Sequence, residues 1–220
     1  MSVTPELIRQ LLNSENLGDR LRGVNQLRLL DPAIAYKLIQ TAFTDASARV
    51  RYAAVSQMSS LGNQNLAEAL ITLRDCLNDP EPDVQAAAAD SLGALKLTQA
   101  FEDLQHLYQS TPEWLVKFSI VAALGELGDP RGFELLKEAL NSGQDMVQAA
   151  AIGSLGDLGD RRAVALLAAH SLNDDWQIRY RIIQSLERLG GVEAKSILMK
   201  LSQDPVPQVS QAAQASLQIL

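Results

Sequence analysis

One pattern of apolar and small residues recurs along the chain at nearly constant spacing. An apolar residue, which we call the anchor, is followed in most copies by small residues three and four positions later, by Leu or Met eight positions later and by Leu or Ile eleven positions later. Positions 0, +4, +8 and +11 share one face of an α-helix, because successive residues turn by about 100°. Each copy therefore predicts an amphipathic helix, which we call helix B.

The anchors define a repeat. They are Val50, Val84, Val116, Val147, Ile178 and Val209, so that successive anchors are 34, 32, 31, 31 and 31 residues apart. A degenerate earlier copy, DRLRGVNQLRLL at 19–30, falls one further 31-residue step back. Self-similarity at this period is typical of arrays in which each unit buries its apolar face against its neighbours.

Shorter helical stretches lie between the copies of helix B, and we call each of them helix A. Examples are PRGFELLKEAL at 130–140 and RRAVALLAAHSL at 161–172. Gly128, Asp129 and Pro130 supply a helix stop, an N-cap and a first-turn proline in succession. No segment alternates with a period of two for long enough to predict a strand. The sequence therefore predicts an all-α solenoid of about six to seven two-helix repeats.

The repeat resembles the HEAT class most closely. That class carries an Asp before helix B and a basic residue six positions later, and the two bridge adjacent repeats. Asp45 and Arg51 match both positions, whereas Asp79 with Gln85 matches only the acidic one. The resemblance implies an incomplete ladder of ion pairs within a single HEAT-like domain that spans residues 1–220.

Positions +2, +6 and +9 of helix B point away from the predicted core, and position −2 joins them where the helix has begun. HEAT-like solenoids bind partners along the surface lined by helix B, so these positions are candidates for ligand contact. Basic-aromatic pairs occupy positions +1 and +2 in every second repeat, and position −2 adds a tryptophan in the two later copies. The candidate binding residues are Arg51, Tyr52, Trp114, Lys117, Phe118, Trp176, Arg179, Tyr180 and Arg181.

The intervening repeats carry small residues at the outward positions, namely Ala86, Gly93, Ala149, Gly153 and Gly156. With neighbouring helices about 10 Å apart, alternate repeats would hold aromatic walls about 20 Å apart over a smooth floor. Such a groove suits a flat, anionic or partly apolar ligand, or a helix of a partner protein.

The basic residues have a structural alternative. An arginine at position +1 can bridge two repeats, so Arg51 and its equivalents are either ligand contacts or bridges. Arg181 occupies position +3, where the other copies carry Ala or Ser near the edge of the predicted core. A guanidinium buried there needs a partner, which could be Asp174, Asp175, a carboxylate of the preceding repeat or a carboxylate of the ligand.

Composition and charge narrow the function classes. The chain has 220 residues, is 47% hydrophobic and carries a net charge of −7. An acidic chain without a basic run argues against a nucleic-acid partner, because DNA and RNA binding need a basic surface. The N-terminus lacks a basic segment followed by an apolar run, and the longest apolar stretch, AVALLAA at 163–169, is too short to span a bilayer. We therefore expect a cytoplasmic protein without membrane insertion.

Catalytic chemistry is thinly represented. Cys76 is the only cysteine, and its leucine neighbours on helix A indicate a core thiol. His106 and His170 are 64 residues apart, without a second metal ligand at helical spacing, so no metal site is predicted. Asp90 and Glu187 are the only carboxylates on the presumed groove. Any catalysis would rest on binding or on a single acid or base, and no catalytic residue can be named.

Four segments carry a closer resemblance to one protein family. They are ARVRYAAVSQ at 48–57, DVQAAAADSLGALKL at 83–97, EWLVKFSIVAALGELGDPRGFELLKEAL at 113–140 and DWQIRYRIIQSLERLGG at 175–191. With their Trp, Arg-Tyr and Lys-Phe insertions, they resemble the NblB family of cyanobacterial phycobilisome degradation proteins, which are HEAT-like relatives of the phycocyanin bilin lyase subunits. The resemblance spans nearly the whole chain.

The resemblance implies a role in dismantling the light-harvesting antenna. It implies phycobiliproteins (phycocyanin and allophycocyanin) and a small proteolysis adaptor as partners. No cofactor is required, and phycocyanobilin is implied as a ligand or substrate. Its two propionates suit Arg or Lys, and its flat conjugated system suits aromatic side chains. Two functions remain open: a lyase-like factor that cleaves or transfers the thioether link between bilin and phycobiliprotein, and a non-catalytic adaptor whose groove holds a protein helix.

Overall fold

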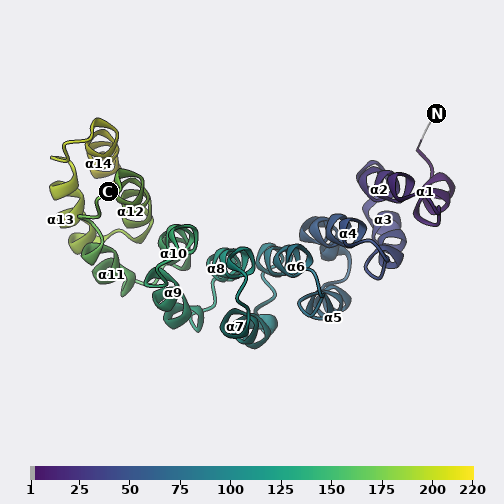
Figure 1. Cartoon of the computed structure of the whole chain (residues 1–220). Helices are drawn as coiled ribbons and strands as arrows, with labels where there is room; N and C mark the ends of the chain where they lie inside the picture. The colour runs from purple at the N-terminus through teal and green to yellow at the C-terminus, as the bar shows by residue number, and fades with distance from the viewer. Residues whose placement is uncertain (1–2) are drawn as a thin grey trace. The chain divides into compact units, whose positions relative to one another are not determined.

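Helices are the only regular elements in the computed structural model, which describes residues 3–220 (Figure 1). The α-helices are α1 (Pro5–Leu12), α2 (Leu17–Gln26), α3 (Pro32–Ile39), α4 (Ala48–Leu61), α5 (Leu66–Cys76), α6 (Pro82–Ala94), α7 (Phe101–Ser110), α8 (Trp114–Leu127), α9 (Gly132–Leu140), α10 (Asp145–Leu158), α11 (Ala163–Ala169), α12 (Trp176–Leu189), α13 (Gly191–Leu201) and α14 (Pro207–Ile219). Short 3-10 helices are η1 (Leu27–Leu29), η2 (Gln40–Ala42), η3 (Gly62–Gln64) and η4 (Thr98–Ala100). The predicted all-α architecture of two-helix repeats is confirmed. Within residues 3–220, no helix is both long enough and apolar enough to pass through a bilayer.

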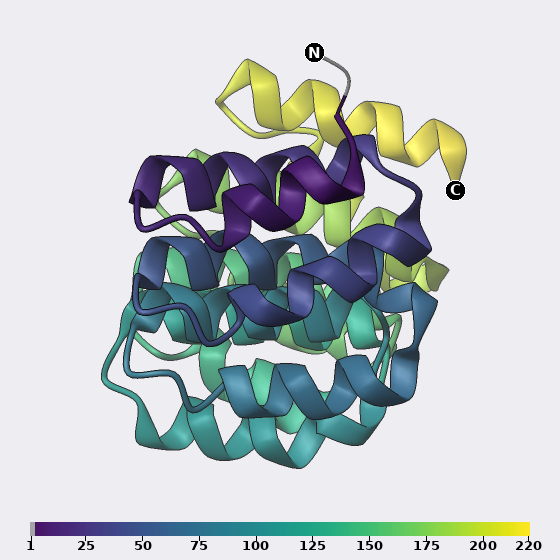
Figure 2. The same cartoon turned by 90° about the vertical axis from the view of Figure 1, so that its right-hand side faces the viewer.

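The helices fall into two compact units, Met1–Ala123 and Leu124–Leu220, which are described separately. In the first unit, α4 packs between α2 and α6, while α1, α3 and α5 each pack on the even-numbered helix that follows. In the second unit, α12 packs between α10 and α14, and α9, α11 and α13 form the other row (Figure 1). Figure 2 shows the helices of the first unit stacked nearly parallel. Even-numbered helices are thus the predicted helices B, and odd-numbered helices are helices A.

The buried interior follows the anchor pattern. All five valine anchors are fully buried, and Ile178 is 7% exposed. The residues at position +8 are also fully buried in five of the six copies, namely Met58, Leu92, Leu124, Leu155 and Leu186. The apolar stripe of each helix B therefore faces its own helix A and the neighbouring repeats, as the periodicity predicts.

The turn from α8 to α9 differs from the prediction in one respect. Gly128 adopts a left-handed conformation, with φ of 65°, and ends α8 as expected. Asp129, however, accepts a hydrogen bond from the backbone N–H of Arg131 at 3.0 Å, and its own carbonyl accepts from Gly132 at 2.9 Å. Residues 129–132 thus form a turn, and α9 begins after Pro130, which the sequence placed inside the helix.

Position +9 faces outward in some repeats but not in all, which corrects the prediction in part: Ser59 is exposed, whereas the glycines at this position are buried. Gly93 and Gly156 are buried, and a Cβ atom on Gly156 would lie 2.9 Å from Cα of Ser185 at position +7 of the next helix B. On Gly93 the same atom would lie 2.7 Å from Cα of Ala123. At these two glycines, position +9 therefore faces the following helix B rather than open solvent. Ala86 is also buried, at 4% exposure, which leaves less open floor than the sequence predicts.

Candidate functional site

Arginines at position +1 bridge successive repeats. Arg51 donates to both carboxylate oxygens of Asp79, at 2.7 and 2.8 Å, and to the backbone carbonyl of Asp45 at 2.9 Å. Arg179 holds Asp204 in the same fork, at 2.7 and 2.9 Å, and also donates to two backbone carbonyl groups. The bridging alternative therefore describes both arginines, whose guanidinium groups are engaged by protein atoms.

A third bridge was missed because it lies in the degenerate first copy of the repeat. Arg20 donates to Asp45 at 2.7 and 3.2 Å, so Asp45 pairs with the arginine of the preceding repeat and Arg51 pairs onward with Asp79. The sequence does contain a signal for this bridge. One 31-residue step before the anchor Val50 is Asp19, and Arg20 therefore occupies position +1 of the first copy. The ladder is incomplete, as the resemblance to HEAT repeats implied.

Three other residues at position +1 contact the segment that precedes their own helix B. The amide of Gln85 donates to the backbone carbonyl of Asp79 at 2.8 Å, and the amide of Gln148 donates to that of Leu140 at 2.9 Å. In the first unit, the ammonium of Lys117 lies 5.3 Å from the ring centre of Tyr108. Position +1 therefore stabilises the path from helix A to helix B.

The bridging carboxylates are held in their ionised form. The Arg179 guanidinium hydrogen bond lowers the pKa of Asp204 and outweighs the opposing effect of burial. Burial would raise the pKa of Asp79, but the hydrogen bonds from Arg51 and from the backbone N–H of Glu81 bring it below its usual value. Each pair is nearly neutral in sum, so neither arginine presents a free charge to a ligand.

Three of the predicted binding residues meet in one open cleft between α12 and α14. Trp176, Tyr180 and Arg181 line a space of about 460 Å³. The cleft is completed by Gln177 and Gln184 of α12 and by Gln208 of α14. The indole of Trp176 is 39% exposed. We call this space the α12/α14 cleft.

The sequence predicts that the Arg181 guanidinium is buried near the core and needs a partner there, and the structure shows otherwise. Its side chain is exposed, and it makes no ion pair or hydrogen bond with any residue in the range 3–220. A long side chain at the core edge can extend into solvent, so neither Asp174 nor Asp175 is needed to neutralise it. Arg181 is thus a free cation in the cleft, two residues from the engaged Arg179.

Local capping explains how α12 presents these side chains. The carboxylate of Asp175 accepts from the backbone N–H of Gln177 at 2.8 Å, and the amide oxygen of Asn173 accepts from the N–H of Asp175 at 2.9 Å. These bonds start the helix at Trp176. Trp176 and Tyr180 are then one helical turn apart on the same face.

The first unit has a cleft between α4 and α6 that is equivalent to the α12/α14 cleft, but its lining residues carry different charges. Tyr52, 48% exposed, lines about 310 Å³ together with Ala48, Arg49, Glu81 and Asp83. Tyr52 and Tyr180 both occupy position +2, so the repeat places an aromatic wall in both clefts. Here the opposite wall is acidic, whereas the α12/α14 cleft has no acidic lining residue.

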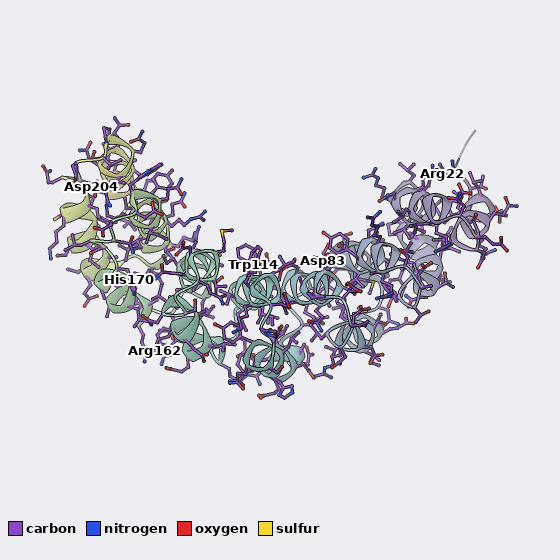
Figure 3. The ribbon with its side chains drawn as sticks, in the orientation of Figure 1. Arg22, Asp83, Trp114, Arg162, His170 and Asp204 are labelled. Atoms are coloured by element: carbon purple, nitrogen blue, oxygen red, sulfur yellow. The ribbon has the colours of Figure 1, made fainter. Side chains whose placement is uncertain are left out.

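The remaining predicted residues lie in the part of α8 that belongs to the first unit. Trp114 is 51% exposed and projects from the side of α8 opposite α7 (Figure 3). Phe118 and Lys117 are half-buried. Trp114 and Phe118 are four residues apart in the sequence, as are Trp176 and Tyr180. The sequence also predicts that the aromatic side chains of alternate repeats, such as those on α8 and α12, form walls about 20 Å apart. That spacing stays a prediction.

The sequence missed Gln177, Gln184 and Gln208 as cleft residues. Gln184 lies at position +6, one of the outward positions, so the helical periodicity does indicate it as a cleft residue. Gln208 belongs to the last helix, where polar residues are expected from any terminal repeat. A larger space of about 620 Å³ between α11 and α13 contains none of the predicted binding residues.

The surroundings of the candidate reactive side chains shift the pKa of the Cys76 thiol and of the Asp90 carboxyl upward. Burial, followed by the nearby charges of Asp79 and Asp75, raises the pKa of the Cys76 thiol to about 12. Glu187, one of the two predicted groove carboxylates, accepts a hydrogen bond from the Ser216 hydroxyl. Burial raises the pKa of the other, Asp90. Among residues 3–220, no cluster of three His, Cys, Asp or Glu side chains has the geometry to hold a metal ion. The arrangement offers binding groups in the clefts and a protonated thiol in the core.

Comparison with known proteins identifies the repeat. The model of the HEAT repeats matches residues 70–147 and 135–218. A chain of the complex of CpcE and CpcF of phycocyanin lyase from Nostoc sp. PCC7120 is 22% identical with a TM-score of 0.66, over 100% of this chain and 96% of that chain. A search of curated proteins gives no match.

Two further solved structures have a similar fold. The archaeal HEAT-like repeats protein from Thermococcus onnurineus NA1 is 15% identical with a TM-score of 0.61, over 100% of this chain and 97% of that chain. An engineered protein is 18% identical with a TM-score of 0.62, over 97% of this chain and 67% of that chain. At these identities the likeness shows the fold, an α-solenoid.

Proposed function

Because the chain belongs to the HEAT-repeat family, whose members bind along rows of helices, we propose that it binds phycobiliproteins through the α12/α14 cleft. One observation carries the proposal: Trp176, Tyr180 and the free cation of Arg181 are presented together in that cleft. Aromatic and arginine side chains dominate the binding energy of protein interfaces, because they bury large areas and form strong polar contacts.

The choice of partner has separate support. The chain is similar in fold to a chain of the CpcE and CpcF complex of phycocyanin lyase, over nearly the full length of both. Its Arg-Tyr, Lys-Phe and Trp insertions also resemble the cyanobacterial phycobilisome degradation proteins. We therefore propose phycocyanin or allophycocyanin as the partner. The process that the protein serves would be phycobilisome disassembly in the cytoplasm.

A second candidate function is the handling of the phycocyanobilin chromophore, including its detachment. It is favoured by the exposed guanidinium of Arg181 beside two aromatic rings, which could contact a propionate and a conjugated plane. Detachment would require a group that acts on the thioether bond. The Cys76 thiol is protonated and buried, so the binding role has the stronger support.

The test is to mix the purified protein with holo-phycocyanin and to follow complex formation and bilin absorbance together. We expect a complex with an unchanged pigment spectrum. Replacing Trp176 or Tyr180 by Ala should weaken the complex by about 1–3 kcal/mol, because each ring loses contact area and stacking. Ile71→Ala, a change at a 63% exposed side chain in α5, serves as the matched control.

The alternatives give different results. Release of pigment with a change in spectrum would favour chromophore detachment. A complex whose affinity is the same for the wild type, Trp176→Ala and Tyr180→Ala would contradict the assignment to this cleft. The absence of any complex with phycocyanin and with allophycocyanin would contradict the proposed function itself.

A further inference from the structure

The α12/α14 cleft has two parallel strips of side chains. Trp176 and Tyr180 form the aromatic strip, while Gln177, Arg181 and Gln184 form a polar strip at spacings of four and three residues. At 1.5 Å per residue, the lining positions of α12 extend over about 12 Å. Gln208 closes the cleft from α14. The site is therefore elongated along α12, with apolar and polar contacts side by side.

The charge of the cleft suits a ligand with one negative group. Arg181 is its only charged lining residue, although the chain as a whole has a net charge of −7. The neighbouring Arg179 is committed to Asp204 and is 8% exposed. A linear tetrapyrrole has two carboxylates, so one of them would lack a cationic partner here. One Asp or Glu side chain would be matched by Arg181 alone.

The three glutamines favour an extended polypeptide over a helix. Their amides make no hydrogen bond with any other residue of the described range 3–220, so in the free protein they are available to a ligand. Covering them with a ligand that offers no donors or acceptors would leave them unsatisfied, at a cost in affinity. A helix has already paired its backbone groups internally, whereas an extended segment presents free N–H and C=O groups.

From these three features we propose that the α12/α14 cleft binds an extended, acidic segment of a partner polypeptide. At about 3.3 Å per residue, the 12 Å strip accommodates about four residues. The acidic side chain lies on Arg181, the segment's backbone pairs with the glutamine amides, and an apolar side chain packs on Trp176 and Tyr180. This inference rests on the proposed function for the identity of the partner, though its chemistry comes from the cleft.

The cleft between α4 and α6 provides an internal contrast. It has the equivalent tyrosine, Tyr52, but Glu81 and Asp83 form its opposite wall. Arg49 also lines this cleft, but the two carboxylates outnumber it and disfavour an acidic segment. Such a segment should therefore bind in the α12/α14 cleft and not in this one. Tyr52→Ala should therefore leave the binding of an acidic peptide unchanged, while Tyr180→Ala should weaken it.

The experiment uses fluorescein-labelled eight-residue peptides with one central Glu, Gln or Lys between two leucines, and measures their affinity for the full-length protein by fluorescence anisotropy. We expect the wild type to prefer the Glu peptide to the Gln peptide by about tenfold, since Arg181 adds a charge-assisted contact. Arg181→Glu should reverse the preference in favour of the Lys peptide. Arg28→Glu, the same change at an exposed arginine in η1, should keep the wild-type preference.

Several results would overturn the inference. These are equal affinities of the Glu and Gln peptides for the wild type, a preference that persists in Arg181→Glu, and tighter binding of the same peptide locked as a helix. Binding of free biliverdin that depends on Arg181, without binding of any peptide, would identify the pigment as the occupant instead.

Phycocyanin measured on the same variants separates this inference from the proposed function. Phycocyanin binding without discrimination among the peptides overturns only the inference. Discrimination among the peptides without binding of phycocyanin or allophycocyanin overturns only the assignment of the partner.

Discussion

The guanidinium of Arg179 lies 2.7 Å from the carboxylate of Asp204, which belongs to the next repeat along the chain. The two side chains are 10% and 6% exposed, so this pair is largely withdrawn from water. Arg181, two residues away, is exposed and lines the α12/α14 cleft. The two arginines of one helical turn therefore differ in their surroundings: Arg179 is engaged in a bridge between repeats, whereas Arg181 is exposed and available for the binding role that we propose.

Replacing Arg179 by Gln should lower the free energy of unfolding by about 2 kcal/mol, because Asp204 would remain partly buried without its charge-assisted hydrogen bonds. Arg181→Gln should leave that free energy nearly unchanged, because its side chain is exposed and unpaired. Urea unfolding of both variants measures the difference. Equal losses of stability, or a larger loss for Arg181→Gln, would contradict these roles.

The Arg179–Asp204 pair should also make stability depend on acid. The pKa of Asp204 is lower in the folded chain than its unfolded value of about 3.9, so the pair stabilises the fold above that pH. The contribution is lost as the pH falls through the lowered pKa. Urea unfolding at a series of pH values from about 6 to 2 should show a shallower decline for Asp204→Asn than for the wild type.

Asp145→Asn, at an exposed carboxylate that starts α10, is the matched control for the acid experiment. It should retain the wild-type decline. A profile for Asp204→Asn that parallels the wild type would show that the bridge does not contribute to acid sensitivity.

Two glycines of α10 should respond oppositely to replacement by Ala. A Cβ atom on Gly156 would lie 2.8 Å from Cβ of Ser185, and both helices would have to shift. We expect Gly156→Ala to destabilise the chain by about 1–3 kcal/mol. Gly153 has no atom within 4 Å of such a Cβ, so Gly153→Ala should stabilise α10 by up to about 1 kcal/mol. Thermal unfolding of the two variants tests the contact, and destabilisation by both would contradict it.

The Cys76 thiol should be unreactive in the native protein. Burial raises its pKa to about 12, so near pH 8 it is almost entirely the thiol rather than the nucleophilic thiolate. Ellman's reagent should therefore react slowly with the native protein and rapidly after unfolding in concentrated urea. Fast reaction of the native protein, at the rate of the unfolded chain, would contradict this burial.

The repeat and its core were determined by the sequence alone. The anchors recur every 31 to 34 residues, and all of them are buried, because a helix periodicity read from the sequence reports which face meets the core. The same reasoning placed Trp176, Tyr180 and Tyr52 on the surface, where they line clefts. The direction of a side chain relative to the apolar stripe of its own helix depends only on nearby residues. The sequence alone is therefore enough to predict it.

Only the tertiary structure decided what each outward residue meets. Arg51 and Arg20 find their carboxylates 28 and 25 residues away, and Gly156 meets Ser185 of the next helix B. Gln208 reaches the α12/α14 cleft from a different helix than the other lining residues. A helical wheel gives a direction but says nothing of the neighbour in that direction. In a row of packed helices that neighbour determines whether an arginine is bound, a glycine is buried or a tryptophan is left open to a partner.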